Sequence, residues 1–235
     1  MTKKAFTMAE VLITLGIIGI VAAMTLPAVI NNARDRQFRA MFKKQVSVIS
    51  QALQMIIVED ENVMVFEKWS DMMYYVCRFG EKLNAAKSGI RCDDVLSNYI
   101  SGEDYTRKDK NFQWHKESKW YDKKGNPITL NTGYTPYTFY LPDGAWINFN
   151  CYRQIFVDVN GAKNPNTVGR DIFYLVIPKN AQTPGFFENK SGNRKYTIVN
   201  SCSGTGNFAY IYDDTYIDDC KNGSGWGCSP LYILQ

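Results

Sequence analysis

Three sets of residues in this sequence have types and spacing that could do chemistry. Glu10 is the only ionisable side chain from residue 6 to residue 30, so it is a carboxylate inside an apolar run. A second set offers oxygen donors within one short segment, as a calcium ion requires: Asp158, Asn160 and Asp171. The third set comprises six cysteines, which are candidates for disulfides: Cys77, Cys92, Cys151, Cys202, Cys220 and Cys228.

Residues for enzymatic catalysis are scarce. His115 is the only histidine, so a His-rich zinc site is impossible and a histidine-based triad has one candidate. It lies in a lysine-rich polar segment, where an exposed surface histidine is the ordinary interpretation. The sequence has no Gly-x-Ser-x-Gly elbow and no phosphate loop. We predict that the protein is not an enzyme and has no cofactor apart from the calcium candidate.

The composition of the 235 residues is that of a globular domain. Hydrophobic residues make up 45% of the chain, which is enough to form a core and excludes a wholly disordered protein. The net charge of +4 is not concentrated in a long basic run. Lysines and aromatic residues between 108 and 124 could contact bases and phosphates, but a solvated loop is favoured. A nucleic-acid partner is therefore not expected.

The N-terminal segment is long and apolar enough to cross a membrane. As a helix, residues 6–30 would extend about 37 Å at 1.5 Å per residue, against about 30 Å for a hydrocarbon core. Lys3 and Lys4 precede the apolar run, so the positive-inside rule keeps the N-terminus in the cytoplasm. This predicts a single-pass protein in contact with membrane lipid, with the remainder outside the cytoplasm.

Three interpretations of this segment compete. It could be a secretory signal peptide cut after the small residues 21–23, or a plain signal anchor. In the third, the Glu10 carboxylate pairs with the positive N-terminus of a neighbouring copy of the helix and fixes the axial register. Without such pairing, Glu10 would be an interfacial charge that reaches the lipid headgroups.

The sequence Ala-Phe-Thr-Met-Ala-Glu-Val-Leu-Ile at residues 5–13 resembles the processing site of type IV pilins and type II secretion pseudopilins. The resemblance implies that a prepilin peptidase cuts between Ala5 and Phe6, and that the new amine of Phe6 is methylated. Glu10 then becomes the fifth residue of the mature chain. One departure is Ala5, because the family usually has Gly before the cut.

Two further residues fit the same resemblance, which covers roughly residues 3–30. Gly19 lies where the family often has a helix-loosening glycine, and Pro27 where it has a kink-forming proline. Pro27 would remove one helical hydrogen bond and bend the helix. Ordinary packing between membrane helices remains an alternative explanation for the glycines.

The resemblance implies a structural subunit of a type IV pilus or a type II secretion pseudopilus. Its implied partners are the prepilin peptidase, copies of itself or other pilin-like subunits, and the inner-membrane assembly machinery. Its implied location is the bacterial inner membrane, with the globular part on the extracytoplasmic side, and then the filament. The alternative is a signal-anchored or secreted extracytoplasmic binding domain.

The helix is predicted to continue beyond the membrane. Apolar residues recur every three or four positions along one face: Phe38, Phe42, Val46, Ile49, Leu53 and Ile56 or Ile57. Acidic residues 59–61 oppose the helix macrodipole and predict a break. The predicted regions are a leader (1–5), a membrane or filament-core helix (6–30), its amphipathic continuation (31–60) and an extracytoplasmic head (61–235).

The head is predicted to be α+β, a pilin-like antiparallel sheet packed on the long helix. Short helices are expected at residues 63–77 and 94–99, with a polar loop at 101–126. Alternating apolar residues predict strands at 137–141, 145–149, 154–159, 173–177, 196–199 and 209–212. The first two strands would be joined by a hairpin turn that contains Asp143 and Gly144.

Calcium and disulfides are the remaining predictions for the head. Some members of the resembled family hold calcium in a head loop, which favours Asp158, Asn160 and Asp171 as ligands. The alternative is that these side chains form Asx turns and cap main-chain amides, and the EF-hand pattern fails here. For the cysteines, 15 pairings are possible. Nearest-neighbour pairing predicts Cys77–Cys92 and Cys220–Cys228, which leaves Cys151–Cys202.

Overall fold

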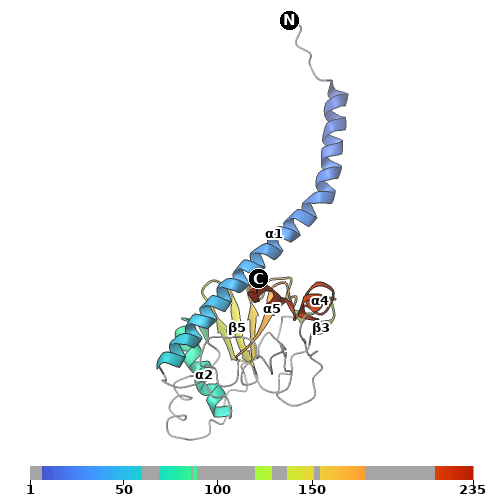
Figure 1. Ribbon diagram of the computed structural model, residues 1–235. Helices are drawn as coiled ribbons and strands as arrows, with labels where there is room; N and C mark the ends of the chain where they lie inside the picture. Colours follow the sequence, from blue (N-terminus) through green and yellow to red (C-terminus); the bar gives the residue numbers. More distant parts are fainter. Residues whose placement is uncertain are drawn as a thin grey trace. The chain divides into compact units, whose positions relative to one another are not determined.

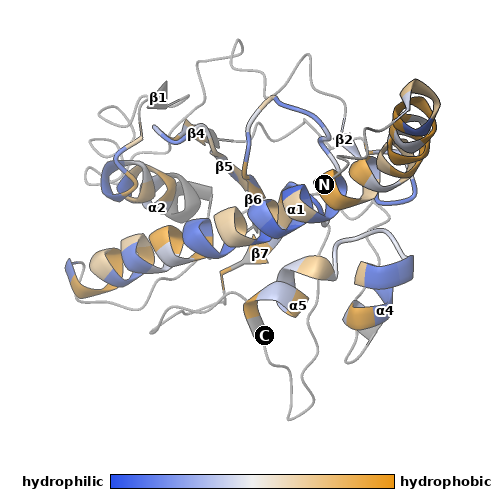
Figure 2. Cartoon of the chain, turned by 90° about the horizontal axis from the view of Figure 1, so that it is seen from above, coloured by the Kyte–Doolittle hydropathy of each residue, from blue (hydrophilic) through white to orange (hydrophobic). Residues whose placement is uncertain are grey.

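Helix α1 (Met8–Glu59) is the first element that the structure describes, and it contributes to both compact units of the chain, residues 1–37 and 38–235. The computed structural model describes residues 7–59, 69–85, 87–88, 120–128, 137–150, 154–177 and 215–234. In the first unit, the large apolar side chains of α1 are exposed on all sides. Figure 2 shows these turns in the colours of hydrophobic residues.

The second half of α1 is amphipathic, as predicted. Its buried positions follow the helical repeat: Phe38, Phe42, Gln45, Ile49, Ala52, Leu53 and Ile56. The helix is described as far as Glu59, and residues 60 and 61 of the expected break lie outside the described residues. Gln45 is an exception to the pattern, because a polar side chain is expected on the solvent face of an amphipathic helix and this one is buried. Its side-chain Nε2 donates to Oδ2 of Asp143 at 2.8 Å, a contact 98 residues away that periodicity cannot show.

Five antiparallel strands form the main sheet, in the order β1-β4-β5-β6-β7. Their bounds are β1 (Lys87–Ser88), β4 (Tyr137–Tyr140), β5 (Trp146–Asn150), β6 (Gln154–Asp158) and β7 (Ile172–Val176). Four of them confirm predicted strands to within about a residue at most ends. The strands predicted at 196–199 and 209–212 lie outside the described residues. The α+β class is therefore correct.

One face of the sheet packs against two helices, which lie side by side across it (Figure 1). They are the second half of α1 and α2 (Trp69–Lys82). The ring of Phe42 stacks on the ring of Phe173 in β7, with 4.0 Å between centroids and a 16° angle between planes. Alternate residues of β6 and β7 enter this core because successive side chains of a strand point to opposite faces.

The opposite face carries a second, smaller core around Trp120, Phe156, Tyr174 and Trp226. Trp120 belongs to a short hairpin of β2 (Trp120–Tyr121) and β3 (Pro127–Ile128). The prediction of an uninterrupted loop at 101–126 is wrong at this end, because Trp120 packs edge-on against Phe156. Residues 101–119 are not among those described.

Helix α2 continues to Lys82, beyond the predicted end at residue 77, because the apolar repeat continues through the buried side chain of Phe79. It is described from Trp69 onward, and residues 63–68 of the predicted helix lie outside the described residues. The helix expected at 94–99 lies outside the described residues. Two further helices, α4 (Thr215–Asn222) and α5 (Cys228–Leu234), were not predicted. Each has no more than eight residues, too few for a clear helical repeat.

Candidate functional site

Reciprocal hydrogen bonds close the start of α1. The Thr7 main-chain N–H donates to Glu10 Oε2 at 2.9 Å, and the Glu10 main-chain N–H donates to Thr7 Oγ1 at 3.2 Å. The Thr7 hydroxyl also donates to Glu10 Oε2, at 2.9 Å. This is a capping box, in which a Glu side chain reaches back to an otherwise unpaired N–H. Glu10 is therefore more than a lone charge, and Thr-x-x-Glu before an apolar run is the sequence signature by which this cap could have been predicted.

Beyond the cap, α1 has the surface of a helix made for an apolar medium. By length and composition it is the one helix, within the part of the chain that the structure describes, that could cross a membrane. Its two threonine hydroxyls bond to the helix itself, Thr14 Oγ1 to Val11 O at 3.0 Å and Thr25 Oγ1 to Val21 O at 2.9 Å. Such bonds satisfy a hydroxyl where water is absent.

Pro27 lies inside α1, as predicted, and the helix continues on both sides of it. Proline has no N–H, so one carbonyl of the preceding turn loses its helical partner. The bend expected there stays a prediction. The two residues of the expected processing site, Ala5 and Phe6, lie outside the described residues.

The segment between β6 and β7 brings the three predicted oxygen donors together. Asp171 accepts from two main-chain amides, Asn166 N to Oδ2 at 2.8 Å and Thr167 N to Oδ1 at 2.7 Å. Asp158 Oδ1 accepts from Asn160 N at 3.2 Å, which forms an Asx turn. The structural roles that were the alternative to calcium binding are therefore present.

The same segment keeps buried oxygens that accept no hydrogen bond. They are Asp158 Oδ2, Asn160 Oδ1 and Asn166 Oδ1. Burial and the adjacent Asp171 carboxylate raise the pKa of Asp158 well above its ordinary value, and burial also raises the pKa of Asp171. Hard oxygen donors of this kind, next to two buried acids, fit a calcium ion. Asn166 is a donor that sequence analysis missed, because its spacing matches no calcium-loop pattern.

Calcium binding at this loop stays a prediction. No group of three or more His, Cys, Asp or Glu side chains suited to a metal is found among the described residues. A ligand set here would therefore combine acid and amide oxygens: Asp158, Asn160 and Asn166, with Asp171 beside them. Because both oxygens of Asp171 already accept from amides, it would act mainly through its charge.

The Cys220–Cys228 disulfide is confirmed. Cys77 is also disulfide-bonded, and its partner lies outside the residues described, so the predicted Cys77–Cys92 and Cys151–Cys202 pairings stay predictions. The loop closed by the disulfide is arranged around Asp219. Its Oδ1 accepts from Ser224 N at 2.8 Å, and its Oδ2 accepts from Gly227 N at 2.8 Å. Sequence analysis missed this role, since these contacts need the folded loop.

Among the described residues of the basic and aromatic segment at 108–124, Trp120 and Lys123 have side chains with structural contacts. The Trp120 ring is buried in the second core, so it is not available as a stacking platform for bases. The Lys123 ammonium donates to the carbonyls of Cys220 and Lys221 at the end of α4. His115 lies outside the described residues.

Comparisons of this chain with models of protein families, with curated proteins and with solved structures find no match.

Proposed function

We propose that this chain is a structural subunit of a type IV pilus or a type II secretion pseudopilus, cut before Phe6 and assembled through α1. The observation that carries the proposal is one carboxylate, Glu10, at the start of an apolar helix that is capped at Thr7. A plain anchor has no need of a charge at this position, and an intramembrane charge is costly unless it is paired.

The proposed role of Glu10 is to pair with the amine of a neighbouring subunit. Cleavage before Phe6 leaves a new amine one residue ahead of the cap residue Thr7. In a bundle of apolar helices, a carboxylate and an amine attract one another far more strongly than in water. Only one axial offset between neighbouring helices brings the two charges together, so the pair would set the register of the filament.

The test separates the charge of Glu10 from its role in the cap. Glu10→Gln keeps an oxygen that can accept from Thr7 N, whereas Glu10→Ala removes both the charge and the acceptor. The proposal predicts that both variants reach the membrane and are cut, and that neither forms filaments, as measured by filaments sheared from cells. Normal assembly of Glu10→Gln would contradict it and leave Glu10 with a capping role alone.

The rival function is an extracytoplasmic binding domain held by a signal anchor. In that case neither Glu10 variant changes the behaviour of the head, and the chain keeps its N-terminus or loses the whole apolar segment. Thr7→Ala distinguishes the two functions further. It weakens the cap alone and retains the carboxylate, so assembly should fall less than in Glu10→Gln.

A second proposed property is calcium binding by the loop between β6 and β7. Asp158, Asn160 and Asn166 would hold the ion through their buried, unpartnered oxygens. The bound cation would offset the two buried carboxylates and hold the loop in place; it would take no part in a reaction. Affinities of extracellular calcium sites commonly lie around 10⁻⁴–10⁻³ M.

Calcium removal provides the test. Free calcium at 100 times its Kd is expected to stabilise the fold by about 2.7 kcal/mol. Thermal unfolding with calcium and with a chelator would detect this difference. Asp158→Asn should lose most of this gain, and the control Asp218→Asn, an exposed acid of α4, should keep it. Equal unfolding temperatures of the wild type with and without calcium would refute the site.

A further inference from the structure

Strand β7 has a sequence that can pair with itself. Residues 172–177 read Ile-Phe-Tyr-Leu-Val-Ile, with no charge, proline or glycine. Short segments of this kind, rich in β-branched and aromatic residues, are the ones that form self-associating strands. β7 is also the last strand in the order of the described sheet. An open edge with this sequence would be a template for pairing with another chain.

Main-chain groups of Ile172 and Tyr174 that point outward from β7 have partners within the chain. Alternate residues of an edge strand point their N–H and C=O away from the sheet. At Ile172 the N–H donates to Thr167 O at 3.2 Å, and the carbonyl accepts from Gly169 N at 2.8 Å. At Tyr174 the N–H donates to the side-chain Oγ of Ser229 in α5, at 2.9 Å and fully buried. A side chain of the C-terminal helix thus occupies the position of a next strand.

Helix α5 packs against β7 through side chains, and the Cys220–Cys228 disulfide links it to α4. Tyr232 packs edge-on against Phe173 with 5.9 Å between ring centroids, and Arg39 lies 4.5 Å above the Tyr232 ring. Figure 1 and Figure 2 both place α5 beside β7. With seven residues, α5 is too short to be stable alone, so it depends on these contacts and on the Cys220–Cys228 disulfide.

We infer that residues 215–234 guard the β7 edge of the sheet that the structure describes, and that β7 pairs with β7 of a second copy when α5 is released. The partner is a second copy because an antiparallel pair about a two-fold axis places the same uncharged strand on both sides. Such a pair satisfies the main-chain groups that Ser229 and the 167–169 turn satisfy in the single chain. In this interpretation the disulfide serves to keep the chain from self-pairing.

The test uses the full chain in phosphatidylcholine nanodiscs with one chain per disc, so that only the heads can meet. The released variant is Cys220→Ser, Cys228→Ser and Ser229→Ala together. Hydrogen exchange of the Tyr174 amide should become at least about ten times faster than in the wild type. Discs should then associate in a concentration-dependent way, as measured by sedimentation velocity. Discs that stay single at high concentration while the Tyr174 amide exchanges quickly would overturn the inference.

A peptide and a milder variant separate edge pairing from general unfolding. A peptide with the sequence of residues 172–177, lysine-flanked and N-methylated at alternate positions, covers an open edge and cannot extend it. It should block association of the released variant, and association unaffected by it would contradict the inference.

Ser229→Ala alone keeps the disulfide and should speed hydrogen exchange of the Tyr174 amide, whereas Ser229→Thr keeps the hydroxyl and should not. Unchanged Tyr174 exchange in Ser229→Ala would equally overturn the guard role.

Discussion

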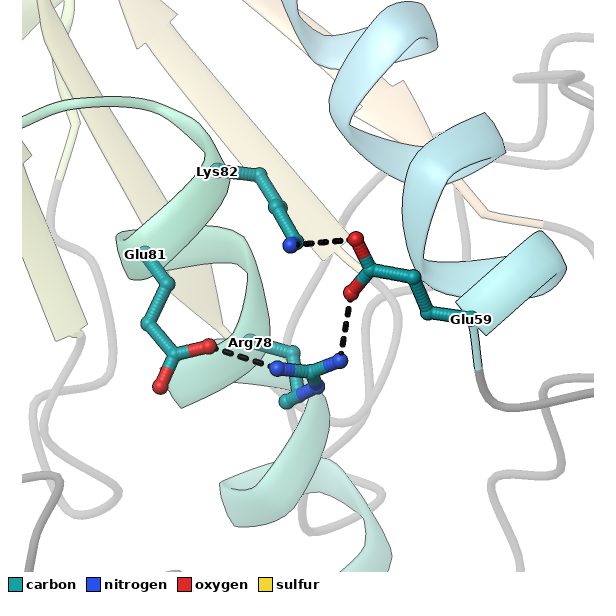
Figure 3. A network of polar contacts seen from close by, with 4 residues as sticks. All are labelled: Glu59, Arg78, Glu81 and Lys82. Carbon is teal, nitrogen blue, oxygen red and sulfur yellow. Dashed lines mark hydrogen bonds and ion pairs between the residues drawn. The ribbon is translucent and has the colours of Figure 1, made fainter.

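At the scale of single residues, Glu59 acts as a tether as well as a helix end. Its Oε1 accepts from Lys82 Nζ at 2.6 Å and its Oε2 from Arg78 at 2.7 Å, so the last turn of α1 is tied to α2 (Figure 3). Arg78 also pairs with Glu81 at 2.6 Å. Exposed ion pairs usually contribute little, but here one carboxylate joins two helices through two bonds. The acidic residue that predicted the break is thus also the one that holds the next helix.

The Glu59 contacts predict a pH-dependent stability. The hydrogen bond from Lys82 lowers the pKa of Glu59 below its ordinary value of 4.5, and the pairing with Arg78 adds to this. A lowered pKa in the folded state gives stability that is present above pH 4.5 and is lost as the pH falls through the folded value. The thermal unfolding temperature should fall less steeply between pH 7 and pH 3 for Glu59→Gln than for the wild type.

High salt provides an internal check on the same experiment. The Glu59 side chain is 43% exposed, so salt should screen its ion pairs. High salt should therefore reduce the difference in pH dependence between the wild type and Glu59→Gln. The control is Glu81→Gln, which leaves both Glu59 bonds intact and should follow the wild-type curve more closely. Identical curves for Glu59→Gln and the wild type at low salt would show that the tether contributes nothing.

At the scale of elements, the turn between β4 and β5 fastens the sheet to α1. Gly144 has a φ of +88°, a conformation that L side chains rarely adopt, and its N–H donates to Leu141 O at 2.9 Å. The turn presents Asp143 to Lys44 Nζ at 2.5 Å and to Gln45 Nε2 at 2.8 Å. The turn itself could be predicted from Asp-Gly. Its partners on α1 could not, because no local pattern links residues almost 100 positions apart.

Packing of α1 on the sheet predicts a large effect of one aromatic side chain. Phe42 is fully buried and stacks on Phe173, so Phe42→Ala should lower the free energy of unfolding by about 3–5 kcal/mol. The matched control is Lys43→Ala, an exposed neighbour on the same helix, which should change it by no more than about 0.5 kcal/mol. Denaturant unfolding in detergent measures both. Similar losses in the two variants would contradict the assigned burial.

At the scale of the whole molecule, the elements that could be predicted from the sequence are those with a local periodic pattern of apolar residues. The apolar repeat gave the amphipathic half of α1, and alternation gave four strands, since both reflect which side faces the core. The packing of Trp120 on Phe156, the buried Gln45 and the edge contact of Ser229 were not predictable, because each depends on a partner far along the chain. At the candidate site, Glu10 was found as a lone charge, and its cap with Thr7 was missed.

The proposed role in a filament depends on the apolar, capped start of α1. It requires the mature chain to begin just before the cap, at Phe6, so that a new amine is available for pairing with Glu10. Every other interpretation of the N-terminal segment gives a different first residue. The first residue of the mature protein therefore distinguishes the proposed functions more directly than any property of the head.

The decisive measurement is the mass of the N-terminal peptide of the protein recovered from its native cells. For a filament subunit we expect a chain that begins at Phe6 and carries one additional methyl group on its amine. A chain that begins at Met24 would mean a secreted domain without its apolar segment, and an intact Met1 or Thr2 would mean a plain anchor. Either of these results would contradict the proposed filament subunit.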